Sequence, residues 1–280
     1  MSSARLAAGI GRSRLAGLGL AALIVAVGGV RAAEPKAFTQ AVGDLTEIDL
    51  VPIPGGSVTL PDSVTPGKTV TVTIKPLYVS KTELRWEQFD PFLFRQDLTE
   101  KEIAKGVDAK NRPSMPYVPP DRGFGHDGWP TISISYLAAV KYCEWLSKKT
   151  GKAYRLPTEA EWQWACLGGG KPAKLSAEDA AKVAWFKDNS EAKTHESGKL
   201  AANGYGLVDM LGNAREWAVT AAGNPVLKGG GYADEVVALQ AGSRAIPSKD
   251  WQKTDPQNPK SRWWLSDAPW AGFRIVCEIP

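Results

Sequence analysis

Apolar and polar residues alternate in two early stretches of the chain, and both are predicted to be strands. The segments 47–56 (EIDLVPIPGG) and 68–80 (KTVTVTIKPLYVS) are rich in β-branched residues and are bounded by glycine or proline. Two short stretches near the end, 225–232 (PVLKGGGY) and 271–279 (AGFRIVCEI), have the same character and are also predicted to be strands. The region between 105 and 130 is rich in Gly, Pro, Asp and Asn, which favours a long ordered loop.

A helical period appears in the middle of the chain. The segment 82–93 (TELRWEQFDPFL) is predicted to be helical at least up to Pro91, with Thr82 as its N-cap. The clearest helix covers 135–152 (SYLAAVKYCEWLSKKTGK), where apolar residues recur every three or four positions and Gly151 stands where a C-terminal cap belongs.

A further helix begins after Thr158. Thr158 and Glu161 form a T-x-x-E capping box, in which each side chain bonds the other residue's backbone N–H. These residues are therefore interpreted as structural rather than catalytic. No internal repeat is found, and the pattern as a whole predicts a mixed α and β domain with short helices and many loops.

The N-terminal residues have the pattern of an export signal. Three arginines precede a charge-free apolar run at 15–30, and small residues follow it at 30–32. This run is short for a membrane span, which needs about 20 apolar residues. We therefore expect a signal peptide at 1–32, a short linker at 33–46 and one domain at 47–280, in a periplasmic or extracellular protein. An uncleaved N-terminal anchor is the alternative.

Charge and residue counts exclude some classes of partner and site. The formal charge is +4, but four arginines and no acids precede Glu34, so the remainder is neutral and shows no basic footprint for nucleic acid. Two histidines are too few for a three-histidine metal centre. Three cysteines in an oxidising compartment allow one disulfide at most.

Two carboxylates lie within an apolar stretch at 203–219 (NGYGLVDMLGNAREWAV). Asp209 and Glu216 flank Gly212, Asn213 and Ala214 in a segment whose other residues are typical of a core. Because an unpaired buried carboxylate is costly, both acids need a partner. From these residues alone, that partner is either a cation or the backbone amides of the loop itself.

Several motifs, in a fixed order, resemble one known family. These are IPGG at 53–56, then YCEWLSKKTGKAYRLPTEAEWQWAC, NGYGLVDMLGNAREW, VLKGGGY and GFRIVCE. Together they resemble the formylglycine-generating-enzyme (sulfatase-modifying factor) domain, a variant of the C-type-lectin-like fold. The resemblance implies an α+β fold with two main short helices, small antiparallel sheets and much irregular loop.

The resemblance also implies a structural calcium ion and a disulfide. The calcium ligands would be the Asp209 side chain, the carbonyl oxygens of Gly212 and Ala214, and the Glu216 carboxylate. Calcium suits such a site because it is a hard cation that accepts six to eight oxygen ligands. The disulfide would join Cys143 and Cys277, leaving Cys166 free and buried.

The family's copper chemistry is not supported by these residues. The resemblance places the two copper-binding cysteines at positions that hold Asp234 and Leu239 here. A carboxylate and a leucine do not form a two-thiolate copper site. The related sulfoxide synthases take their iron ligands from a histidine-bearing domain that is absent here, so no copper or iron site is evident.

A cleft near Asp234 is the remaining candidate for ligand binding. Asp234 with Arg244 would bind a polar ligand or peptide, with tryptophans stacking on it; the alternative is a structural ion pair beside core tryptophans. The candidate cleft residues are Arg215, Tyr232, Asp234, Arg244, Trp263, Trp264 and Trp270.

Three functions are compatible with these residues. The first is an exported, calcium-stabilised binding or accessory module for a peptide, a protein or a small polar ligand. The second is a diverged oxidase or oxygenase of the family, acting on an exported protein or a small thiol. The third is a structural component of the cell surface. No nucleic acid partner is expected, and no membrane span after signal cleavage.

Overall fold

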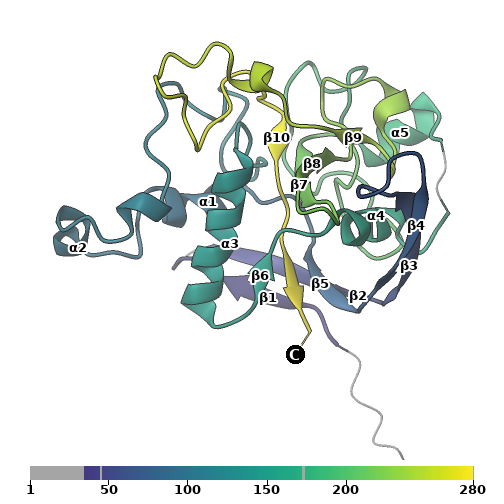
Figure 1. The fold of residues 1–280 in the computed structure, drawn as a ribbon, viewed down its shortest axis with the longest axis horizontal. Helices are drawn as coiled ribbons and strands as arrows, with labels where there is room; N and C mark the ends of the chain where they lie inside the picture. Colours follow the sequence, from purple (N-terminus) through teal and green to yellow (C-terminus); the bar gives the residue numbers. More distant parts are fainter. Residues whose placement is uncertain (1–34, 45, 172–173, 280) are drawn as a thin grey trace, which may run out of the picture. The chain divides into compact units, whose positions relative to one another are not determined.

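A five-stranded antiparallel sheet forms the base of the domain. The computed structural model describes residues 35–44, 46–171 and 174–279. In the order β1-β2-β5-β11-β6, the strands of this sheet are Phe38–Ala41, Glu47–Ile53, Leu77–Ser80, Val276–Glu278 and Tyr154–Arg155. The last strand of the chain thus lies between an early strand and a middle one, which fixes the C-terminal segment in the core (Figure 1).

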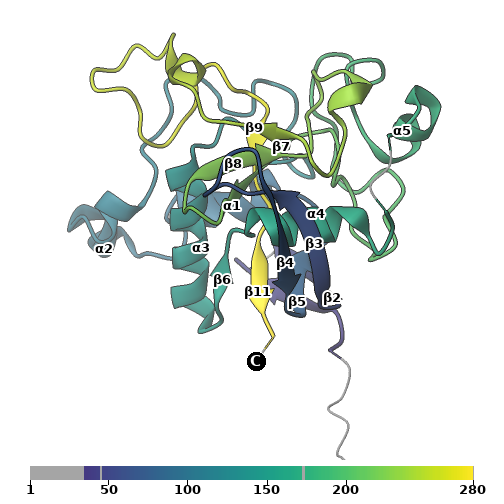
Figure 2. The same cartoon turned by 45° about the vertical axis from the view of Figure 1, so that its right-hand side comes forward.

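Two smaller sheets complete the β structure that is described. One has the order β10-β7-β8-β9, with bounds Ala271–Gly272, Arg215–Val219, Pro225–Lys228 and Arg244–Ala245, and only its β10–β7 pair is parallel. The other is the hairpin of β3 (Gly56–Pro61) and β4 (Thr69–Ile74). Figure 2 shows this hairpin beside α4.

The helices are short, and the two main ones are those predicted. The α-helices are α1 (Trp86–Leu93), α2 (Glu100–Ala104), α3 (Tyr136–Thr150), α4 (Glu159–Leu167) and α5 (Ala177–Val183). The 3-10 turns are η1 (Ala109–Asn111), η2 (Val236–Ala238) and η3 (Lys249–Gln252). Helix α3 ends at Gly151 with φ 73°, and α4 begins with the predicted Thr158–Glu161 capping box. The α+β fold class is confirmed.

Some element boundaries differ from the prediction for local reasons. The predicted strand 68–80 is two strands in different sheets, because Pro76 interrupts the ladder between β4 and β5. Helix α1 starts at Trp86 rather than after Thr82, whose hydroxyl donates to the Glu83 carbonyl instead. The predicted linker 33–46 contains β1, a strand of the large sheet, so the domain begins earlier than expected.

The five-stranded sheet separates two apolar clusters. Along β11, Val276 packs in the cluster that contains α4, whereas Cys277 packs in the cluster that contains α1 and α3. This alternation follows from the two-residue period of a strand. Trp86, Trp162 and Trp217 are almost fully buried, so large aromatic side chains fill much of the core.

The predicted signal peptide at 1–32 lies outside the described residues. Within the described parts of the chain, no helix has both the length and the hydropathy needed to cross a membrane.

Candidate functional site

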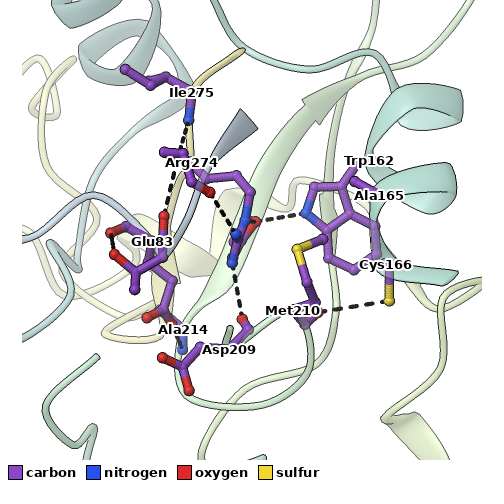
Figure 3. A network of polar contacts seen from close by, with 12 residues as sticks. Glu83, Trp162, Ala165, Cys166, Asp209, Met210, Ala214, Arg274 and Ile275 are labelled. Carbon is purple, nitrogen blue, oxygen red and sulfur yellow. Dashed lines mark hydrogen bonds and ion pairs between the residues drawn. The ribbon is translucent and has the colours of Figure 1, made fainter. Parts of the chain in front are cut away.

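The segment that carries the predicted calcium ligands is a loop with left-handed backbone at three positions. Asp209, Gly212 and Asn213 have φ values of 54°, 75° and 50°. At Gly212 a Cβ atom would lie 2.3 Å from the Trp185 carbonyl oxygen, so only glycine fits there. The loop brings Asp209 toward Arg274 of the C-terminal segment (Figure 3). Glu216 also lies against Arg274.

Glu216 forms a sealed ion pair with Arg274. The Arg274 Nε lies 2.6 Å from Glu216 Oε2 and its Nη2 lies 2.7 Å from Oε1, and the two side chains are 0% and 1% exposed. The indole N–H of Trp162 donates to the same carboxylate at 2.6 Å. Arg274 also donates to the carbonyl oxygens of Val208 and Asp209, so it ties the loop to the last strand region.

Two further carboxylates lie close to this ion pair. Asp209 accepts the Gly198 N–H at 2.6 Å through Oδ2, while its buried Oδ1 has no hydrogen-bond partner among the described residues. Glu83 accepts the backbone N–H of Ala214 at 2.9 Å and the hydroxyl of Ser197 at 2.6 Å. The Arg274 network, defined as Arg274, Glu216, Asp209 and Glu83, therefore holds three acids and one base.

The excess of acids in the Arg274 network changes the ionisation of its members. Burial, together with the charges of Asp209 and Glu216, raises the pKa of Glu83 well above its usual range. Burial also raises the pKa of Asp209 to about 6, although Gly198 and Arg274 oppose the shift. For Arg274, burial opposes the charged form, but the charges of Glu216, Glu83 and Asp209 together outweigh it and the pKa is raised. The network thus favours an added proton or cation.

The fit of this loop to calcium differs between the two predicted carboxylate ligands. The unpartnered Oδ1 of Asp209 suits a hard cation. Both oxygens of Glu216 are already bound by Arg274, so this carboxylate would have to be shared between the guanidinium and the ion. No cluster of three or more His, Cys, Asp or Glu side chains arranged for a metal occurs in the described ranges, so backbone carbonyls would have to supply most ligands.

Asp234 occupies a turn that is closed by its own side chain. Its carboxylate accepts the Gly231 N–H at 2.7 Å and the Arg215 Nε–H at 2.9 Å. The Arg215 guanidinium lies 4.6 Å from the centroid of the Trp270 ring. Leu239, at the other position that the resemblance assigns to copper, is fully buried against Ala180 and its neighbours. Neither residue fits a copper ion.

Arg244 and Asp234 do not pair with each other. Arg244 Nε lies 2.9 Å from the buried carboxylate of Glu159, which also binds Lys228 at 3.1 Å. The structural ion pair expected between Asp234 and Arg244 is not formed, because the ladder between β8 and β9 directs Arg244 toward the start of α4. Binding of a ligand by these two residues stays a prediction.

Similarity to known proteins identifies the family of this chain. Residues 35–279 match the family described as the sulfatase-modifying factor enzyme 1-like domain. The chain belongs to this family.

Individual relatives share parts of this sulfatase-modifying-factor domain. A formylglycine-generating enzyme of Mycobacterium tuberculosis is 34% identical over 107 residues, 33% of this chain and 34% of that protein. The inactive C-alpha-formylglycine-generating enzyme 2 of Bos taurus is 25% identical over 222 residues, 63% of this chain and 72% of that protein. The chain thus spans only between 26% and 34% of the length of the first curated relatives that it matches.

Solved structures support the fold. Treponema denticola variable protein 1 aligns with a TM-score of 0.63 and 21% identity, over 88% of this chain and 100% of that chain. PvdO from Pseudomonas aeruginosa aligns with a TM-score of 0.62 and 21% identity, again over 88% and 100%. At this level of identity the likeness concerns the fold alone.

The predicted cleft residues of the sulfatase-modifying-factor domain do not line one cavity. Arg215, Asp234 and Trp270 form one group. Tyr232 is buried edge-on against Phe124, with ring centroids 5.5 Å apart. Trp263 and Trp264 are both 6% exposed. Trp264 lines a pocket that the other six candidates do not line.

The three cysteines of the domain are free thiols in the structure. Cys143 and Cys277 pack in the same apolar cluster, on the α3 side of the large sheet, but the bond predicted between them is not formed. It stays a prediction for the oxidised protein. Cys166 is free as expected but only partly buried; burial of its thiol raises the pKa to about 12.

Glu83 and Arg274 are the network members that sequence reasoning missed. Glu83 stands at the start of a segment predicted to be helical, where an acid is unremarkable. The available signal was an acid placed between a predicted strand that ends at Ser80 and the aromatic residue Trp86, since a charge between two buried segments needs a partner.

Proposed function

We propose that this chain is an exported binding or accessory module of the sulfatase-modifying-factor family, without copper-dependent oxidase activity. The observation that carries this proposal is the state of positions 234 and 239. Asp234 is engaged by Arg215 and by the Gly231 N–H, and Leu239 is part of an apolar cluster. Two soft thiolate ligands are replaced by groups with other structural partners.

We further propose that calcium stabilises the module. Asp209 and the carbonyl oxygens of Gly212 and Ala214 would hold the ion. The Glu216 carboxylate would be shared between Arg274 and the ion. The ion would supply positive charge to a buried group of three acids and one base. The support is the unpartnered Oδ1 of Asp209.

The alternative function is a diverged oxidase or oxygenase that acts on an exported protein or a small thiol. It is favoured by the partial identity with proteins named formylglycine-generating enzymes. It requires a reactive constellation other than two thiolates at positions 234 and 239.

Oxygen uptake separates the two functions. The mature chain, purified without chelators and shown to be folded by near-ultraviolet circular dichroism, is mixed with a cysteine-containing peptide, with and without added copper. We expect no oxygen consumption above that of copper and peptide alone. Uptake that saturates with the peptide and requires the folded protein would overturn the accessory role.

Export is the remaining part of the proposal, and it rests on the pattern of residues 1–32. Cell fractionation with N-terminal sequencing tests it. We expect mature protein that starts near Ala33; recovery of the full-length chain in the membrane fraction would favour the surface-anchored alternative.

A further inference from the structure

The β3–β4 hairpin is covered along one edge and open along the other. Figure 1 shows the hairpin at the right-hand side of the domain. On the side away from β4, β3 is tied to α4: Gln163 Nε2 donates to the Thr59 carbonyl at 3.3 Å. The Trp164 indole donates to the Pro54 carbonyl, just before β3, at 2.8 Å. Beyond β4, no further strand pairs with the hairpin among the residues described.

The ladder between β3 and β4 determines which backbone groups face the open edge. In an antiparallel pair, hydrogen-bonded and non-hydrogen-bonded positions alternate along each strand. The Asp62 N–H donates to the Lys68 carbonyl at 2.8 Å, so Val70 and Val72, two and four positions further on, also bond toward β3. The backbone N–H and C=O groups of the residues between them point outward. These residues are Thr69, Thr71 and Thr73, all exposed, and their backbone groups have no hydrogen-bond partner in the described parts of the chain.

Strand β4 lacks the features that usually protect an edge strand. Such strands commonly carry a charged residue, a proline or a bulge, which prevent another strand from pairing. The β4 sequence TVTVTI contains no charge and no proline, and it pairs residue for residue with β3 over its whole length. Because a two-stranded sheet is only marginally stable by itself, the hairpin would also gain stability from further strands. The open edge is therefore suited to strand addition.

A second copy of this chain offers a matching strand, which is β4 itself. The other open-ended sheets are bordered by shorter strands: β1 has four residues, and β6, β9 and β10 have two each, within the ranges described. Because the outward backbone groups lie on alternate residues, two antiparallel copies of β4 must pair these residues with each other. The register with the largest overlap places Thr71 opposite Thr71 of the second copy.

The side chains are complementary in this same register. Val70 would lie opposite Val72 of the second copy, and both valines are only partly buried in the single chain, so the contact would cover apolar surface. No like charges would lie directly opposite each other, because Lys68 would lie opposite Ile74 of the second copy, and Lys75 opposite Gly67.

We propose that two copies of this chain associate through antiparallel pairing of β4 with β4, which joins two hairpins into one four-stranded sheet. The outward threonines would supply about six hydrogen bonds between the chains, two for each hydrogen-bonded pair. A contact of one short strand is smaller than a standard interface of roughly 1,600 Å², so the association depends on protein concentration. It goes beyond the accessory role and does not depend on it.

Sedimentation equilibrium of the mature chain tests the association. We expect the mass to rise from that of one chain to that of two as the protein concentration increases. Thr71→Pro removes the central donor of each copy and no hydrogen bond within the hairpin, since the Thr71 N–H points outward. We expect it to raise the dissociation constant by about tenfold or more. The mass of one chain at every soluble concentration, or an unchanged dissociation constant in Thr71→Pro, would overturn the proposal.

Charge exchange at the centre of β4 tests the register. Thr71→Lys and Thr71→Glu would each place like charges opposite each other, and we expect each to weaken association by about fivefold. An equimolar mixture of the two should associate more tightly than either variant alone. A mixture no tighter than the single variants would rule out the proposed register.

Thr59→Lys and Thr59→Glu are the matched controls. The hydroxyl oxygens of Thr59 and Thr71 lie 2.8 Å apart, so substitution of either residue removes the same contact and places a charge on the same face of the hairpin. Thr59 does not lie on the open edge, and we expect its variants to associate like the unsubstituted chain. Equal effects at positions 59 and 71 would rule out pairing through β4. The oxygen-uptake assay reports separately on the proposed function, so either proposal can fail alone.

Discussion

Two arginine–carboxylate pairs in this domain have the same chemistry but different surroundings. Arg274 and Glu216 are 0% and 1% exposed, whereas Arg215 and Asp234 are 22% and 20% exposed. The first pair is joined by Glu83 and Asp209, so acids outnumber bases. The second pair is balanced, and the Trp270 ring supports its guanidinium.

The difference shows where this fold needs an additional charge. In the sealed Arg274 network, desolvation makes every uncompensated charge costly, so a proton or a cation is favoured. In the partly exposed Asp234 turn, one acid and one base compensate each other and water screens the remainder. The first region is thus the candidate for a structural ion, and the second is a closed turn.

Substitution of the arginine in each pair should give the largest difference in the free energy of unfolding between the two pairs. Arg274→Met leaves Glu216 buried without its cation, and we expect the free energy of unfolding to fall by about 3–5 kcal/mol. Urea denaturation followed by circular dichroism measures it. Should Arg274→Met be recovered unfolded, Arg274→Lys provides a milder test with the charge retained. A loss below that of Arg215→Met would contradict the comparison.

Calcium should act on one pair only. At a calcium concentration about a hundredfold above the dissociation constant, we expect the free energy of unfolding to rise by roughly 2.7 kcal/mol. A chelator should remove this added stability. Asp209→Asn should abolish this gain, and Asp234→Asn should retain it. A melting temperature that does not respond to calcium in the unsubstituted chain would show that the calcium proposal is wrong.

The pH dependence of stability should identify Asp209. Because burial raises its pKa to about 6, the folded state binds this proton more tightly than the unfolded state. The resulting stability is full below the unfolded pKa of about 4 and is lost as the pH rises through about 6. With chelator present, we expect the decrease in stability between pH 4 and pH 8 to be smaller by roughly 2 kcal/mol in Asp209→Asn than in the unsubstituted chain. Thermal denaturation between pH 4 and pH 8 measures it, with Asp234→Asn as control; identical profiles for both variants would refute the assignment.

The partly exposed Arg215–Asp234 pair should contribute least to the free energy of unfolding. Arg215→Met removes a partly screened ion pair and a cation–π contact, and we expect a loss of about 1 kcal/mol. The same urea denaturation measures this loss. A loss as large as that of Arg274→Met would mean that the Arg215–Asp234 pair contributes as much to the free energy of unfolding as the buried pair does. It would favour a functional site at the Asp234 turn.

The regular elements of the domain were largely predictable because their signals are local. The apolar period and Gly151 predicted α3, and the Thr158–Glu161 pair predicted the start of α4. Strand β1 was missed because it is a short edge strand whose residues alternate only weakly between buried and exposed. The break at Pro76 was readable, since proline removes a ladder donor.

The partners of the buried charges were much less predictable. Asp209 and Glu216 stood out as carboxylates in an apolar segment, yet the ion pair expected between Asp234 and Arg244 is not formed. Folding could bring any of many basic residues next to a given acid, and the sequence does not say which one. The choice among them depends on strand register, which places Arg215 beside Asp234 and Arg244 beside Glu159.

The sequence by itself determined the family, the order of the main elements and the absence of a cysteine at positions 234 and 239. Those properties follow from residue identity and short spacings. Only the tertiary structure decided that Glu216 is bound by Arg274, 58 residues away, and that Glu83 joins them from a distance of more than 120 residues. Burial sets the energy of a charge, and burial is a property of the packed chain rather than of any segment of it.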